Sequence, residues 1–206
     1  MGLININNYS NPDKINIAGF YPETQCLGPG KRSVIWLQGC LKRCKDCITK
    51  SMQPLTDKCW IDAIDLADFV GQIENIEGVT FLGGEPFLQA EALCKAVWHL
   101  KKIYNLTIMI YTGYALNELT SLNDIHVTKI LNFTDILVDG SYEKDKDEAQ
   151  KWRGSENQQI YFLSERYKKW QWVKEAKGRD IEIIIDSKGH YLALGIPPEG
   201  FYELLP

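Results

Sequence analysis

The chain has 206 residues, 45% of them hydrophobic and 24% charged, which supplies enough apolar material for a folded core and argues against a disordered chain. At about 150 residues per domain, this length favours one domain. A formal net charge of -4 at pH 7 disfavours a globally basic nucleic-acid-binding protein. The sequence has no apolar run near the roughly 18 residues of a membrane-spanning helix and no apolar signal segment, so we expect a cytoplasmic protein with no membrane partner.

Short β-branched runs alternate with amphipathic segments through the first two thirds of the chain. In chain order, the pattern predicts a strand at 33–38, a helix at 62–76, a strand at 78–82, a helix at 90–100 and a strand at 106–111. Short helical segments around Leu116 and at 125–131 then lead to a strand at 135–139. Gly71 is a weak point in the first helix. This alternation favours an α/β fold with a parallel sheet or a partial barrel.

The last third of the chain follows a different pattern. Residues 143–151 are highly charged with almost no apolar face, and we expect this segment to cover a site or to be mobile. A strand at 160–163 precedes a basic and aromatic stretch at 166–179. Two further strands, at 181–185 and 191–194, flank a turn and predict a C-terminal β-hairpin. No linker separates a second domain, so residues 1–206 are predicted to form a single domain.

Three cysteines lie close together directly after the first predicted strand. Cys40, Cys44 and Cys47 form a Cys-x3-Cys-x2-Cys motif that could direct three thiolates to one metal centre. The same spacing, with Leu41 and Ile48, would also suit one apolar face of a short helix. Charged residues between the cysteines argue against such a core helix, so a metal centre is the favoured interpretation.

The number of cysteines bears on the kind of metal. A structural zinc site needs four ligands, and the remaining candidates, Cys59, His99 and His126, lie at no convincing spacing. Iron–sulfur clusters usually have four cysteines, so three would leave one iron open to an external ligand. An open iron indicates chemistry rather than a structural role.

A second motif follows the next predicted strand. Gly83-Gly84-Glu85-Pro86 lies at the carboxyl end of a strand, where α/β folds bind ligands. Taken alone, these residues would fit an ordinary strand-to-helix turn. Together with the Cys-x3-Cys-x2-Cys motif, they resemble the radical S-adenosylmethionine (SAM) superfamily, in which a Gly-Gly-Glu motif lies against the amino group of SAM.

Further segments resemble the small activating-enzyme branch of this superfamily, in particular the activases of anaerobic ribonucleotide reductase. They are Gly28 to Arg32 with the run into Cys40, Thr112-Gly113-Tyr114, Val138-Asp139-Gly140, and Arg153-Gly154-Ser155 with Asn157-Gln158. The resemblance covers roughly residues 28–163, leaving an N-terminal extension at 1–27 and a C-terminal decoration at 164–206. It implies a partial (β/α) barrel of the radical SAM type, followed by the C-terminal hairpin.

The sequence also departs from this branch around the third cysteine. Lys45-Asp46 precede Cys47 and Ile48-Thr49 follow it, where activases often have Pro-Gly before this cysteine and an aromatic residue and Asn after it. Leu27 stands where activases commonly have Asp. Ile48 is then the apolar candidate for contact with the adenine of SAM.

The resemblance also implies the cofactors and their ligands. The residues that would hold a 4Fe-4S cluster are Cys40, Cys44 and Cys47, and those that would bind SAM are Gly83, Gly84 and Glu85. Reductive cleavage of SAM would give a 5′-deoxyadenosyl radical that abstracts hydrogen from a substrate. Thr112 and Asp139 are further candidates near SAM or an associated cation. The alternative roles for these two are a turn threonine and an aspartate that caps the following loop.

The electron for this cleavage must come from a separate protein, because no further cysteine motif provides a second cluster. Residues 31–50 contain six basic residues and one acidic residue, a local charge of +5. Such a basic collar would attract an acidic flavodoxin or ferredoxin, and salt would weaken the attraction. The alternative is that these charges only solvate the cysteine loop.

The resemblance implies a protein or peptide substrate, in one of two versions. One is activation of a glycyl-radical enzyme at a backbone glycine. The other is maturation of a ribosomally made precursor peptide, which would need a separate recognition protein. Both versions stay open at the level of the sequence.

Two further interpretations of the sequence remain. Basic residues between 166 and 179 alternate with Tyr167, Trp170 and Trp172, as in an RNA-modifying enzyme, although an amphipathic helix or a docking edge for an acidic partner is the more common meaning. A non-catalytic, zinc-stabilised binding module would use Cys59 or a histidine as its fourth ligand.

Overall fold

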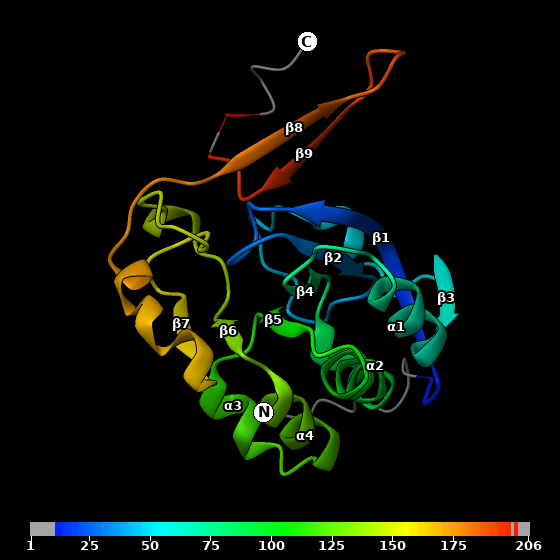
Figure 1. Ribbon diagram of the computed structural model, residues 1–206. Coiled ribbons are helices and arrows are strands. Elements are labelled where there is room, and N and C mark those ends of the chain that lie inside the picture. Colours follow the sequence, from blue (N-terminus) through cyan, green and yellow to red (C-terminus); the bar gives the residue numbers. More distant parts are fainter. Residues whose placement is uncertain (1–10, 199, 202–206) are drawn as a thin grey trace.

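The computed structural model describes residues 11–198, 200 and 201, so the expected extension at 1–27 and decoration at 164–206 are seen only within these ranges. A seven-stranded mixed sheet forms the centre of the molecule, and a separate two-stranded hairpin lies beside it (Figure 1). Within the described ranges, none of the helices combines the length and the apolarity that crossing a membrane requires.

The large sheet has the strand order β3-β1-β2-β4-β5-β6-β7. Its strands are β1 (Lys14–Thr24), β2 (Arg32–Leu37), β3 (Cys59–Asp62), β4 (Gly78–Gly83), β5 (Thr107–Tyr111), β6 (Ile136–Asp139) and β7 (Gln159–Phe162). Strands β2, β4, β5 and β6 pair in parallel, whereas β1, β3 and β7 join the sheet through antiparallel pairs. The predicted α/β fold is confirmed, and the four parallel strands end at one edge of the sheet.

Helices cover one face of this sheet. They are α1 (Ala63–Gly71), α2 (Ala90–Lys102) and α4 (Ile125–Phe133), with the short α3 (Leu116–Ser121) before α4. Asp62 and Asp124 cap α1 and α4, because their carboxylates accept the free backbone N–H groups of the first turn. In β5, Ile108 and Ile110 face this helical layer and Met109 faces away from it, as the two-residue period of a strand requires.

The opposite face of β5, β6 and β7 packs against the chain that follows β7. This basic and aromatic stretch forms a 3₁₀ helix, η5 (Glu165–Lys174). Tyr167 and Val173 are buried, and Tyr167 Oη donates a hydrogen bond to Thr107 Oγ1 at 2.9 Å. Part of the stretch is therefore core, which makes it less suited to a continuous nucleic-acid-binding face.

Strands β1 and β3 were not predicted from the sequence. β1 contains Gly19 and Pro22, two residues that weaken a strand signal. Its pairing with β2 shifts register between Ile17 and Gly19 and again between Tyr21 and Thr24, and the second shift accommodates Pro22. Because β1 lies between β2 and β3, part of the expected N-terminal extension is an interior strand of the sheet.

The first predicted helix ends earlier than expected, at Gly71 rather than at Ile76. A Cβ atom on Gly71 would lie 2.3 Å from the ring of Tyr104, so no larger residue fits here. Asn75 then adopts a left-handed φ of 62°, which a continuing α-helix cannot contain. The chain turns into β4 instead, and Glu77 N donates to Lys31 O at 2.7 Å.

Strands β8 (Ile181–Ile185) and β9 (Tyr191–Gly195) form the predicted C-terminal hairpin. In Figure 1, β9 lies between β8 and the large sheet. Thr24 Oγ1 donates to Glu182 Oε2 at 2.7 Å, and Leu194 is buried. These contacts attach the hairpin to the end of β1.

Candidate functional site

The carboxyl ends of the four parallel strands surround one cavity of about 540 Å³. The cysteine loop enters it after β2, the Gly83-Gly84-Glu85 turn after β4, Thr112-Gly113 after β5 and residues 140–142 after β6. Residues of the C-terminal hairpin and of the charged segment predicted to cover a site also line it. Both sequence motifs thus share one cavity at the edge where α/β folds bind ligands.

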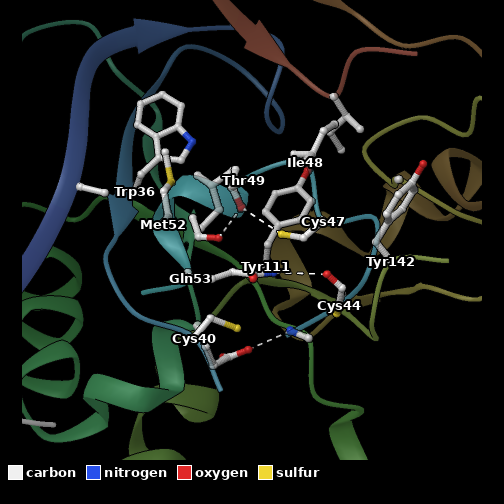
Figure 2. Close-up of a pocket in the computed structure, with 18 of the residues that line it drawn as sticks. Trp36, Cys40, Cys44, Cys47, Ile48, Thr49, Met52, Gln53, Tyr111 and Tyr142 are labelled. Atoms are coloured by element: carbon white, nitrogen blue, oxygen red, sulfur yellow. Dashed lines mark hydrogen bonds between the residues drawn. The ribbon is translucent and has the colours of Figure 1, made fainter. Parts of the chain in front are cut away.

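The three cysteines lie in a loop and not on a helix. Cys40, Cys44 and Cys47 all line the cavity, and their thiols are free of disulfides (Figure 2). Leu41 and Ile48, which an apolar helix face would bury, are 38% and 50% exposed. The alternative in which the cysteines form such a face is therefore wrong.

Hydrogen bonds hold the cysteine loop in place on both sides. Cys40 N donates to Gln53 O at 3.0 Å, and the Gln53 side-chain amide donates to Cys44 O at 3.3 Å. Thr49 Oγ1 donates to Gly83 O at 2.8 Å and joins the loop to the end of β4. The loop is thus fixed by the residues that follow it and by the second motif.

The three thiols line one cavity without meeting at a single point. No three His, Cys, Asp or Glu side chains in the described part of the chain converge closely enough to hold one metal ion. The residues considered as a fourth zinc ligand lie elsewhere: Cys59 is exposed on β3, His99 hydrogen-bonds Asp68 at 2.6 Å, and His126 lies in the first turn of α4. In a cluster each thiolate binds a different iron, so its ligands surround a volume instead of a point.

Glu85 is the buried acid of the cavity, with 1% of its surface exposed. Its Oε1 accepts hydrogen bonds from Thr112 Oγ1 at 2.8 Å and Phe87 N at 3.1 Å, and its Oε2 accepts one from Gly113 N at 2.9 Å. Burial raises the pKa of Glu85 to about 7, although these hydrogen bonds and nearby Lys42 favour the charged form. A carboxylate fixed in this way can receive a cationic group.

The two glycines before Glu85 are required by packing against the cysteine loop. A Cβ atom on Gly84 would lie 2.2 Å from Gly39 O, and one on Gly83, whose φ is 105°, would lie 2.7 Å from Leu37 N. Gly84 N donates to Leu37 O at 2.7 Å, and Glu85 N donates to Gly39 O at 2.8 Å. The glycines therefore join the end of β4 directly to the entry of the cysteine loop.

The other predicted site residues divide into two groups. Thr112 and Ile48 line the cavity, and Thr112 Oγ1 also accepts from Tyr114 N at 3.1 Å. Asp139 is buried but is not among the residues that line the cavity. Its carboxylate accepts the backbone N–H of Leu116 at 2.6 Å and of Gln159 at 3.3 Å, and so holds the starts of α3 and β7.

Two cavity residues were missed by the sequence analysis. The Tyr111 hydroxyl is buried and has no hydrogen-bond partner among the described residues. Lys42 Nζ lies 4.2 Å from the ring centroid of Tyr114 and 3.2 Å from Glu118 Oε2. Tyr111 ends a strand and Lys42 lies between two cysteines. Neither sequence position indicates that the side chain would line a cavity. The unpartnered hydroxyl offers a bound group one polar contact.

Arg32 does not belong to the basic collar. It is fully buried at the start of β2, and its guanidinium donates to neutral oxygens of Thr80, Thr107 and Val79. Lys31 is paired with Glu23. The exposed positive charge of the cysteine loop comes from Arg43, Lys45 and Lys50.

Comparison with known proteins gives a consistent family. A family profile described as a 4Fe-4S single cluster domain matches residues 26–161. Three relatives are each named anaerobic ribonucleoside-triphosphate reductase-activating protein. The one from Escherichia coli (strain K12) is 31% identical over 161 residues, which cover 72% of this chain and 99% of the relative. The one from Salmonella typhi is 32% identical over 155 residues, which cover 70% of this chain and 96% of the relative. The one from Enterobacteria phage T4 is 28% identical over 152 residues, which cover 71% of this chain and 94% of the relative. The chain therefore belongs to the family of the anaerobic ribonucleoside-triphosphate reductase-activating proteins, which places it in the activase-like branch, and it contains a 4Fe-4S single cluster domain.

Proposed function

We propose that this chain is a radical SAM activase that generates a glycyl radical on a protein substrate. The observation that carries the proposal is that the cysteine loop and the buried carboxylate of Glu85 line one cavity at the carboxyl ends of four parallel strands. The relatives are named for the activation of an anaerobic ribonucleoside-triphosphate reductase, which favours activation of a protein over maturation of a precursor peptide.

The residues around the cavity fit the two cofactors. Cys40, Cys44 and Cys47 would hold the 4Fe-4S cluster, and Glu85 would accept the ammonium group of SAM. When bound, these cofactors supply a 5′-deoxyadenosyl radical for hydrogen abstraction by reductive cleavage of SAM. Ile48, half exposed beside the third cysteine, would contact the adenine.

The remaining roles in the proposal belong to the protein itself. Thr112 and Gly113 fix the Glu85 carboxylate through an O–H and an N–H donor, which orients its free lone pairs. Gly83 and Gly84 keep that carboxylate beside the cysteine loop, because only glycine allows their close backbone approach. Asp139 would act at a distance from the cofactors, by holding the first turn of α3.

The proposal extends to the fold and to the electron donor. The four parallel strands and their helical layer would be the partial barrel of the radical SAM type, within a single domain at 1–206. Arg43, Lys45 and Lys50 would attract an acidic flavodoxin or ferredoxin to the cysteine loop, and salt would weaken that encounter.

The test is anaerobic reconstitution with iron and sulfide, followed by dithionite and SAM, with 5′-deoxyadenosine as the measured product. The unsubstituted protein and Cys59→Ala should both form a brown cluster and release 5′-deoxyadenosine, whereas Cys44→Ala should do neither. Cys59 is the matched control because its thiol is also free but lies exposed on β3. A colourless protein that binds zinc and needs Cys59 for it would contradict the proposal and support a structural metal module.

A further inference from the structure

One wall of the cavity comes from a part of the chain outside the family match. The family profile ends at residue 161. The relatives from Escherichia coli and phage T4 align over 99% and 94% of their own length but over only 72% and 71% of this chain. The hairpin of β8 and β9 lies beyond residue 161. Leu192, Ala193 and Gly195 of β9 nevertheless line the cavity, together with residues 196 and 197.

The two strands of the hairpin differ in their position relative to the cavity. Figure 1 shows β9 on the side of the large sheet and β8 on the far side. Of the residues that line the cavity, none belongs to β8. In Figure 2, the reddish strand of the hairpin passes above Ile48, at the side of the cavity where the cysteine loop ends. The outer edge of β9 is therefore the edge next to the site.

The outer edge of β9 carries unpaired backbone groups. The hairpin is a two-stranded sheet, and no third strand pairs with it in the described part of the chain. Asp186 N donates to His190 O at 2.9 Å, and the alternation of an antiparallel ladder then makes Ile184 and Leu192 the next hydrogen-bonded pair. The N–H and C=O groups of Ala193 consequently point away from β8.

The hairpin also exposes large apolar side chains. Ile183, Ile185, Tyr191 and Leu192 are 44%, 68%, 40% and 44% exposed. Proteins normally protect an edge strand with charges, proline or a covering segment, because an apolar edge invites pairing with another chain. Tyr191, Ala193 and Gly195, whose backbone groups point outward, include neither a charged residue nor a proline. This composition suits a strand that pairs with a partner during function.

We propose that β9 is a docking strand for an extended segment of the substrate polypeptide. The segment would pair with the outward backbone groups of Tyr191, Ala193 and Gly195 and would thereby run across the mouth of the cavity. Backbone pairing gives affinity with little dependence on sequence, and the exposed apolar side chains favour apolar residues in the guest. This inference rests on the proposed function, because it states how the protein substrate of that site is held.

The test uses proline to remove one outward N–H group from either edge of the hairpin. Ala193→Pro removes it from β9, and Ile183→Pro removes it from the directly opposite residue of β8, so the second variant is a matched control. Neither change removes a donor from the ladder between β8 and β9. The probe is an anaerobic ribonucleoside-triphosphate reductase polypeptide, and the readout is its equilibrium binding to the cluster-loaded protein.

We expect Ala193→Pro to weaken binding by about tenfold or more, as expected for a lost hydrogen bond and a steric block, and Ile183→Pro to stay within about twofold of the unsubstituted protein. Ile183→Pro, whose residue does not line the cavity, should still cleave SAM without the reductase. As a second measurement, hydrogen exchange on the unsubstituted protein should show that the reductase protects residues 191–195 and leaves 181–185 unchanged.

The outcomes separate this inference from the proposed function. If the unsubstituted protein neither cleaves SAM nor binds the reductase, the proposed function fails, and the inference fails with it. If it binds the reductase but Ala193→Pro binds equally well, or if both proline variants lose binding to the same extent, only the docking strand is overturned. If Ala193→Pro does not fold, the hydrogen-exchange comparison decides by itself.

Discussion

Two fully buried charged side chains lie at opposite ends of the parallel strands. Arg32, at the amino end of β2, satisfies its guanidinium with neutral oxygens, and burial lowers the pKa of this group from its usual value. Glu85, at the carboxyl end of β4, has donors on both carboxylate oxygens, yet burial still raises the pKa of Glu85 to about 7. Arg32 therefore has a structural role, whereas Glu85 is poised near neutral pH beside the cavity.

The raised pKa of Glu85 predicts how the stability of the cofactor-free protein depends on pH. Between about pH 4.5 and 7 the folded protein keeps a proton on Glu85 that the unfolded chain releases, so the free energy of unfolding falls as pH rises through this window. Glu85→Gln has no such titration. From pH 5 to pH 8, we expect the free energy of unfolding of the unsubstituted protein to fall by about 1–3 kcal/mol relative to this variant.

Urea unfolding of both proteins at the two pH values measures this difference. Glu118→Gln is the control, because the backbone N–H of Ala115 and Lys42 lower the pKa of Glu118, which is then ionised at pH 5 and at pH 8. The difference in unfolding free energy between Glu118→Gln and the unsubstituted protein should be the same at pH 5 and at pH 8. An equally constant difference for Glu85→Gln would contradict a buried carboxyl that binds its proton near neutral pH.

At the scale of elements, the sequence pattern predicts what is local and misses what depends on partners. The apolar residues of strands β2, β4 and β5 and of helix α2 follow one uninterrupted pattern within each element, and the structure confirms these four predictions. Strand β1 was missed because Gly19 and Pro22 interrupt it, and only its pairing on both sides stabilises the irregular backbone. The helix ending at Gly71 was predicted too long because Asn75 adopts a left-handed φ of 62°, which the spacing of the apolar residues does not reveal.

The contact between the end of β4 and the cysteine loop gives the second prediction. Gly84→Ala would place a Cβ atom 2.2 Å from the Gly39 carbonyl, so backbone must move on one side. We expect this variant to lose about 1–3 kcal/mol of unfolding free energy and to hold less iron after reconstitution, because Gly39 directly precedes the first cysteine.

Gly113→Ala is the control for this prediction, since its Cβ atom would meet the flexible side chain of Lys42 at 3.3 Å. It should retain its iron content and most of its stability. Iron content per chain and urea unfolding measure both effects. Full iron loading in Gly84→Ala would mean that the cysteine loop can form independently of the β4 turn.

At the scale of the whole molecule, part of the cavity wall could be predicted from the sequence and part could not. The two sequence motifs that line the cavity are short, so Cys40, Cys44, Cys47 and Glu85 could be singled out as candidates from neighbouring residues alone. The other part comes from the segment at 142–154 and the hairpin, which are distant in sequence from the motifs and from each other. Arg179, a residue that the sequence pattern grouped with a basic surface, contacts the first segment and the residues that follow the hairpin.

Arg179 joins the two late segments of the cavity wall through an ion pair that is nearly buried. Its guanidinium binds both carboxylate oxygens of Asp147, at 2.5 and 3.0 Å, and donates to Gly154 O at 2.7 Å. It also reaches Pro197 O at 3.5 Å, directly after the hairpin. The exposed side-chain fractions of Arg179 and Asp147 are 4% and 18%, so water screens this pair little.

Arg179→Gln should therefore destabilise the protein and loosen the hairpin. Removing one partner of a buried pair leaves Asp147 without its counter-charge, and we expect a loss of about 2–4 kcal/mol in the free energy of unfolding. Lys177→Gln breaks the ion pair between Lys177 and Glu148, whose side chains are 66% and 56% exposed. This control should change the free energy of unfolding little. Urea unfolding measures the first effect, and faster hydrogen exchange at 191–197 measures the second. Unchanged exchange at 191–197 in Arg179→Gln would mean that contacts such as Thr24 to Glu182 hold the hairpin alone, and β9 would then keep its place beside the cavity without the charged segment.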